Sequence, residues 1–137
     1  MRKRTKAREY ALQILYQMEM TKDSHSDSVR AFWERESETE ESVREFAGQL
    51  VKGVTENIKD IDAKIAKYAT NWQINRMAVI DRNILRMATF EMLYLGDIPA
   101  KVSINEAVDI AKKYGDKDSG KFVNGVLDKI SKTKAEK

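Results

Sequence analysis

The sequence has no cysteine, one histidine, one proline and only six glycines among its 137 residues. Without cysteine, disulfides and thiolate metal sites are excluded, and a reducing, cytoplasmic setting is compatible. Few Pro and Gly leave the chain poor in the turns that an all-β protein needs, whereas 34% charged residues make it rich in helix formers. No apolar run approaches the roughly 20 residues that cross a bilayer. We therefore expect a soluble, cytoplasmic protein of the all-α class, with no membrane partner.

Residues suited to catalysis are also scarce. His25 lies in a polar stretch and has no cysteine or second histidine with which to complete a common triad or a zinc site. "GKFVNG" lacks the spacing and the Lys-Ser/Thr of a phosphate-binding loop. Asp81 and Glu91 are ten residues apart on one expected helix, about 15 Å along its axis, which is too far for a shared acid–base pair. We expect no enzyme activity, no metal, no cofactor and no small-molecule substrate.

The same two carboxylates have structural interpretations. Glu91 is predicted to accept hydrogen bonds from a neighbouring helix or an arginine. Asp81 is predicted either to do the same or to face a partner protein.

Apolar residues at steps of three and four predict about seven helices. Residues 76–95 are apolar on two sides, so this helix should be the central one. The other expected helices cover residues 4–21, 29–35 and 40–68, with a kink near Asn57, and begin again at Ser103 and at Asp118 or Ser119. No repeat or linker is found, so residues 1–137 are expected to form one domain, with 1–3 and 132–137 frayed.

Two helix starts carry specific capping predictions. Thr39 precedes Glu40 and Glu41, which suit the positive first turn of a helix. In "VSINEA", Ser103 as N-cap and Glu106 three residues later fit a capping box.

The N-terminus concentrates positive charge on a chain whose net charge is only +3. Such an end suits a local anionic partner such as nucleic acid, or is a solvated end with no partner. Charge alone does not separate these interpretations. Five of the first eight residues are basic: Arg2, Lys3, Arg4, Lys6 and Arg8.

Phe122 lies at the edge of the apolar stripe of the last expected helix, directly after Lys121. An aromatic ring beside lysine can stack on an unpaired base, which contributes about 1–3 kcal/mol per base. A phenylalanine in an amphipathic helix is more often part of the core. From the local pattern alone, the core interpretation is favoured.

Three segments in order resemble the NusB family of bacterial transcription antitermination factors. They are "AREYALQILYQ", "NW…R….DRNILRMATFEM" and "IPAKVSINEAVDIAKKYGDKDSGKFVNGVLDKI". The resemblance covers nearly the whole chain. It implies an all-helical fold of two packed antiparallel bundles, no catalysis, and a heterodimer with NusE, a protein of the small ribosomal subunit. That pair binds single-stranded boxA RNA and helps an RNA polymerase antitermination complex read through terminators, notably in ribosomal RNA operons.

The resemblance also assigns residues. It implies RNA binding by the basic arm that contains Arg2, Lys3, Arg4, Lys6 and Arg8, and by a C-terminal group of Asp118, Lys121, Phe122 and Asn124. It therefore favours stacking or edge contact for Phe122. Arg76, Asp81 and Arg82 are predicted to contact NusE. Thr5 and Gly120 depart from the family pattern, which has bulkier or basic residues there in some relatives.

Two other functions remain as alternatives. Bacterial RNA cytosine methyltransferases carry a similar helical domain, so the chain could be the RNA-binding piece of such an enzyme. It could also be a protein-only scaffold in which the basic arm is incidental.

Overall fold

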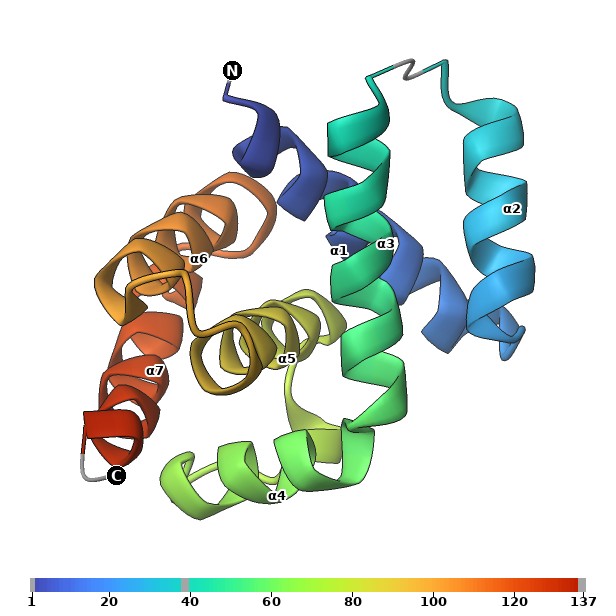
Figure 1. Cartoon of the computed structure of the whole chain (residues 1–137). Helices are drawn as coiled ribbons and strands as arrows, with labels where there is room; N and C mark the ends of the chain where they lie inside the picture. Colours follow the sequence, from blue (N-terminus) through green and yellow to red (C-terminus); the bar gives the residue numbers. More distant parts are fainter. Residues whose placement is uncertain (1, 38–39, 136–137) are drawn as a thin grey trace. The chain divides into compact units, whose positions relative to one another are not determined.

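The computed structural model describes residues 2–37 and 40–135, and every regular element among them is helical. This confirms the all-α class and the number of helices. The α-helices are α1 (Lys3–Thr21), α2 (His25–Arg35), α3 (Glu41–Glu56), α4 (Ile58–Tyr68), α5 (Val79–Tyr94), α6 (Ala100–Tyr114) and α7 (Ser119–Ala135), and a 3₁₀ turn, η1, spans Ile74–Arg76 (Figure 1). They group into two compact units, residues 1–56 and 57–137. None of these helices is long and apolar enough to cross a membrane.

In the first unit, α1 packs against both α2 and α3. The tyrosine of α1, Tyr10, meets the edges of two aromatic rings of α2, with ring centroids 5.5 Å from Phe32 and 5.4 Å from Trp33. Helix α2 begins at His25, earlier than predicted, because the Ser24 hydroxyl accepts a hydrogen bond from the Asp27 amide at 3.2 Å. The predicted N-cap Thr39 lies outside the described residues.

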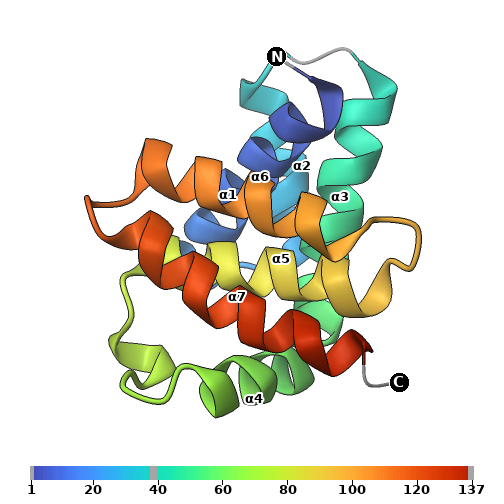
Figure 2. The ribbon, with the colours of Figure 1, turned by 90° about the vertical axis from the view of Figure 1, so that its left-hand side faces the viewer.

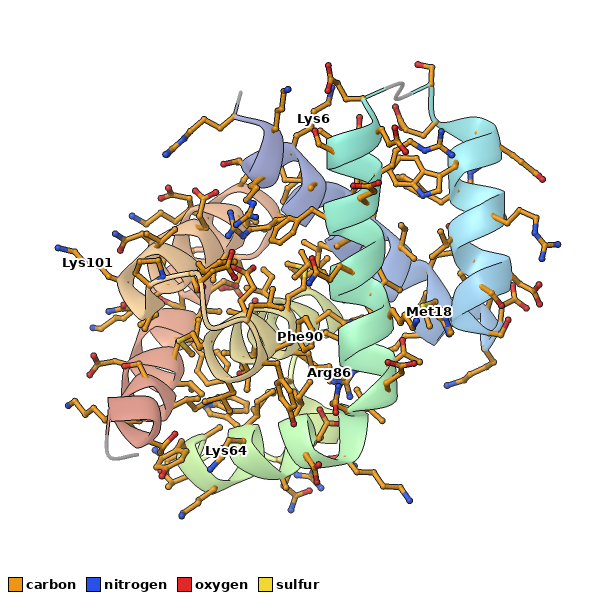
Figure 3. All side chains as sticks on the ribbon, in the orientation of Figure 1. Lys6, Met18, Lys64, Arg86, Phe90 and Lys101 are labelled. Atoms are coloured by element: carbon orange, nitrogen blue, oxygen red, sulfur yellow. The ribbon has the colours of Figure 1, made fainter. Side chains whose placement is uncertain are left out.

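In the second unit, α5 packs against α4, α6 and α7. Figure 2 shows α6 and α7 running in opposite directions across it. Ten of its sixteen residues are buried, which confirms the prediction of a central helix. On its α4 side lies Arg86, which is labelled in Figure 3. Its guanidinium forms a two-pronged ion pair with Asp62, with nitrogen–oxygen distances of 2.8 and 2.9 Å.

The boundaries of α5 and α3 have local causes. Helix α5 begins at Val79 rather than at the predicted residue 76, because the chain first makes the η1 turn. The Arg82 guanidinium stabilises that turn by donating to the carbonyl oxygens of Ile74 at 3.0 Å and Met77 at 3.1 Å. The predicted kink near Asn57 is a break between two helices, since α3 ends at Glu56 and α4 begins at Ile58.

The predicted capping box at Ser103 is wrong. Helix α6 begins at Ala100 with Pro99 as N-cap, so Ser103 lies one turn inside the helix. Its hydroxyl donates instead to Oε1 of Glu91 on α5 at 3.0 Å. Because Glu91 is only 1% exposed, this bond provides a buried carboxylate with a donor. The structural interpretation of Glu91 is therefore confirmed.

The described residues near both ends of the chain are helical. Helix α1 begins at Lys3 and α7 continues to Ala135. Residues 1, 136 and 137, on which part of the predicted fraying falls, lie outside the described residues.

Candidate nucleic-acid and partner interface

The basic N-terminal residues occupy the first turns of α1, where aromatic rings of the first unit hold several of them. The spacing of Arg4 and Arg8 places both on one face of the helix. Their guanidinium carbons lie 4.5 Å and 5.4 Å from the centroid of the Phe46 ring on α3. Lys6 lies over Tyr10, with its ammonium nitrogen 5.9 Å from that centroid. Aromatic side chains of the first unit therefore lie against three cations of this arm.

Exposure differs among these cations. Arg2, Lys3 and Arg4 are on the surface, whereas Arg8 is only 3% exposed. The Lys3 ammonium also pairs with the Glu40 carboxylate at 3.4 Å. Arg4 is thus the arginine of this arm that combines an aromatic support with access to solvent, while an RNA contact by Arg8 stays a prediction.

The second predicted RNA-binding group surrounds the start of α7. Asp116 organises the turn before it: its carboxylate accepts a hydrogen bond from the Asp118 amide at 2.8 Å, and its amide donates to the Ser119 hydroxyl oxygen at 3.0 Å. The Asp118 carbonyl then accepts the Phe122 amide at 3.0 Å, which starts the helix. Asp118, Lys121 and Asn124 are exposed, and Phe122 is half-buried.

Phe122 is only half-buried and is not enclosed in the core. It lines an open pocket of about 340 Å³ together with Trp72, whose ring it meets edge-on at a centroid distance of 6.3 Å. Trp72 is 55% exposed. The remaining lining residues are Arg76, Met77, Ala78, Asp81, Asp116, Asp118 and Ser119.

This pocket joins two groups that were predicted separately. Asp118 and Phe122 come from the predicted RNA-binding set, and Arg76 and Asp81 come from the predicted partner-binding set. Arg82 does not line the pocket. Trp72 was not predicted; its signal in the sequence was a bulky aromatic residue in a stretch without helical periodicity.

Asp81 gives the pocket an unusual acceptor. It is 9% exposed, and its Oδ1 has no hydrogen-bond partner among the described residues. Burial raises the pKa of this carboxyl above its ordinary value; a hydrogen bond from the Ser119 side chain acts in the opposite direction, and the nearby Asp116 adds to the rise.

The lining as a whole is acidic. Three aspartates face it with one arginine, so it suits groups that donate hydrogen bonds better than it suits a phosphate. Two aromatic rings add flat apolar walls. Across the described part of the chain, no three His, Cys, Asp or Glu side chains are grouped so that they could hold a metal ion.

Comparison with known proteins finds relatives over nearly the whole chain. A model of the NusB family matches residues 5–132. The transcription antitermination protein NusB of Thermodesulfovibrio yellowstonii is 49% identical over 139 aligned residues, which cover 95% of this chain and 92% of that protein. The structure of T. maritima NusB aligns with a TM-score of 0.87 at 37% identity, covering 98% of this chain and 97% of the other. A structure of antitermination factors NusB and NusE in complex with double-stranded RNA aligns with a TM-score of 0.88 at 32% identity, covering 97% and 98%.

Proposed function

The chain belongs to the NusB family, and from this premise we propose that it is a transcription antitermination factor that binds boxA RNA as a heterodimer with NusE. A relative that is 49% identical is named a transcription antitermination protein, and a related structure contains NusB, NusE and double-stranded RNA together. The proposal includes action in the cytoplasm within an RNA polymerase antitermination complex, notably in ribosomal RNA operons. It includes no catalytic step, because the named relatives are antitermination factors.

One observation carries the proposal most directly: a single pocket is lined by Phe122 and Asp118 and also by Asp81 and Arg76. A surface shared in this way lets an RNA and a protein partner meet at one place. Phe122 and Trp72 offer aromatic faces or edges to unpaired bases, the usual targets of sequence-specific RNA binding.

The cations supply the second component of RNA binding. Arg2, Lys3, Arg4 and Lys6 begin α1, and Lys121 is exposed next to Phe122. Their attraction to phosphates does not depend on sequence and weakens with salt. We assign the discrimination between RNAs to the aromatic and hydrogen-bonding groups and the sequence-independent affinity to these cations.

NusE is assigned to the Asp81 and Arg76 side of the pocket. Oδ1 of Asp81 accepts no hydrogen bond from the residues that the structure describes, so a donor from NusE would add one to a buried acceptor. If NusE strengthens RNA binding in this way, RNA must strengthen NusE binding by the same factor.

A protein-only scaffold is the competing function, and the acidic lining of the pocket is the observation that favours it. Carboxylates repel RNA phosphates, whereas they attract a basic protein. In that case the cations of α1 would be incidental.

The test is fluorescence anisotropy of a labelled boxA RNA titrated with the protein, with and without NusE. A scrambled RNA of equal composition is the control. We expect NusE to tighten binding and scrambling to weaken it. If both RNAs bind alike and NusE changes nothing, the antitermination proposal is refuted and the scaffold is favoured.

The Phe122→Ala variant assigns the recognition surface in the same assay. Loss of one stacked base corresponds to about 1–3 kcal/mol, or roughly a 5- to 150-fold weaker affinity. Far-ultraviolet circular dichroism is the control for folding. If the variant unfolds, Phe122 is mainly a core residue; if it folds and binds normally, the base contact lies elsewhere.

A further inference from the structure

Helix α6 contributes a lysine to the surface at the start of α7. A methyl group built onto Gly120 would lie 3.1 Å from Cγ of Lys112 and 3.4 Å from its Cε. The Lys112 stem therefore runs across the place where any other residue at 120 would put its side chain. Gly120 itself is buried beneath this stem, although both of its neighbours along the helix surface, Lys121 and Asn124, are exposed.

This packing determines where the Lys112 charge lies. A lysine stem that covers apolar surface leaves its ammonium group at the solvent-exposed rim. Lys121 is next to Gly120 in the chain, and Asn124 is one helical turn further along the same face. Figure 2 shows α6 and α7 side by side, and these two helices pack closely. The ammonium of Lys112 therefore lies at the α7 face that carries Lys121 and Asn124.

The exposed ammonium group of Lys112 is available to an external anion. Lys112 forms no ion pair within the described part of the chain, and Lys117 and Lys121 bring two more ammonium groups to the same turn. Asp116 and Asp118 lie in the same turn but face the pocket, whereas Lys112, Lys117 and Lys121 are all exposed and raise the positive potential of the surface beside it. A polyanion that passes along this face would be attracted by all three.

We propose that Lys112 is an additional RNA-binding residue, which contacts the phosphate backbone next to the bases held at Phe122, and that the absence of a side chain at Gly120 keeps its stem in place. This inference rests on the proposed function, because it assumes that RNA follows the start of α7. It differs from the acidic pocket in chemistry: the pocket suits hydrogen-bond donors, whereas the Lys112 face suits phosphate.

The test compares Lys112→Met with Lys101→Met in the complex with NusE, using boxA anisotropy over a series of salt concentrations. Methionine keeps an unbranched stem and removes the charge. Lys101 is the matched control, because it is exposed on the same helix but eleven residues away, about 16 Å along the axis, and points outward in Figure 3. We expect Lys112→Met to weaken binding about three- to fivefold, the usual scale of one exposed charge contact.

The salt dependence separates a phosphate contact from a general effect. Losing one phosphate contact to single-stranded RNA should reduce the slope of log affinity against log salt by about 0.7. Lys101→Met should leave both affinity and slope unchanged. If Lys112→Met matches Lys101→Met while the wild-type complex still prefers boxA over scrambled RNA, the inference is refuted and the proposed function survives. If the wild type shows no such preference, the proposed function itself fails.

Gly120→Leu tests the role of the glycine. A leucine would displace the Lys112 stem, so affinity should fall by a similar factor, and adding Lys112→Met in that background should cause little further loss. Gly120→Ala adds the helix propensity of a non-glycine residue but only a methyl group against the stem, so its loss of affinity should be smaller than that of Gly120→Leu. Additive losses in the double variant would show that Gly120 does not position Lys112. If Gly120→Leu does not fold, the salt dependence of RNA binding by Lys112→Met decides alone whether Lys112 contacts phosphate. A loss confined to NusE affinity, with unchanged RNA binding by the protein alone, would overturn the phosphate contact in favour of a protein contact.

Discussion

Phe46 is expected to be the side chain that holds the basic arm in place, and replacing it with leucine tests this role. The ring lies between 4 and 6 Å from two guanidinium groups, at 4.5 Å from Arg4 and 5.4 Å from Arg8. Leucine keeps an apolar side chain in a site that is 6% exposed, but it removes the aromatic face. The variant should therefore lose both cation–π contacts while it retains most of the packing.

The size of the effect follows from the burial of each arginine. Exposed cation–π contacts contribute about 0.5–1 kcal/mol and desolvated ones about 2 kcal/mol. Arg4 is exposed and Arg8 is 3% exposed, so the two contacts together should contribute about 2.5–3 kcal/mol. The apolar replacement itself adds a loss of about 1 kcal/mol. We expect the free energy of unfolding to fall by about 3.5–4 kcal/mol.

Urea denaturation of a double-mutant cycle isolates the contacts from the packing. Phe46→Leu is combined in turn with Arg4→Met and with Arg8→Met, and the coupling energy should be larger for Arg8. Because Arg8 is buried, its coupling should persist in high salt, whereas the exposed Lys3–Glu40 pair should weaken. Coupling below about 0.5 kcal/mol for both arginines, which is the ordinary error of additivity, would refute the reasoning.

Three further predictions concern stability. Ser103→Ala removes a donor from the buried Glu91 carboxylate, so urea denaturation should show a loss of about 1–3 kcal/mol; a loss near zero would contradict the importance of this bond. The pKa of Asp81 is raised in the folded protein, so ionisation of this carboxyl lowers the free energy of unfolding as pH rises from the ordinary value of 3.8 through the folded pKa. Asp81→Asn should therefore be more stable than wild type at neutral pH but not below pH 3.8. A less stable variant at neutral pH would contradict this. If the chain is one domain, unfolding followed by Trp33 alone and by Trp72 alone, in variants with the other tryptophan changed to phenylalanine, should give the same midpoint; separate midpoints would contradict it.

The helices could be predicted from the sequence because their signal is local. Apolar residues at helical spacing are enough to locate α1, α3 and α5, and the two-sided pattern of α5 identifies the helix that is covered on most of its surface. The starts of helices were less predictable. Ser103 and Glu106 have the spacing of a capping box, but the Ser103 hydroxyl binds Glu91, twelve residues away on another helix, and no local pattern contains that contact.

The candidate site also depends on contacts between distant residues, which no local sequence pattern contains. Resemblance to a family identified Phe122, Asp118, Arg76 and Asp81 as candidates, although it assigned them to two different partners. Only the folded chain brings residues 72–81 and 116–122 to one pocket. Trp72 was missed because an exposed aromatic residue between helices has no periodic pattern to mark it.

The buried carboxylate of Asp81 has a thermodynamic consequence for complex formation. A partner that donates a hydrogen bond to this carboxylate stabilises its charged form and therefore lowers its raised pKa. In mildly acidic buffer, association would release protons, and the heat of binding would vary with the ionisation enthalpy of the buffer. The affinity would correspondingly increase with pH across that range, so the proton acts as a competitor of the partner at this pocket.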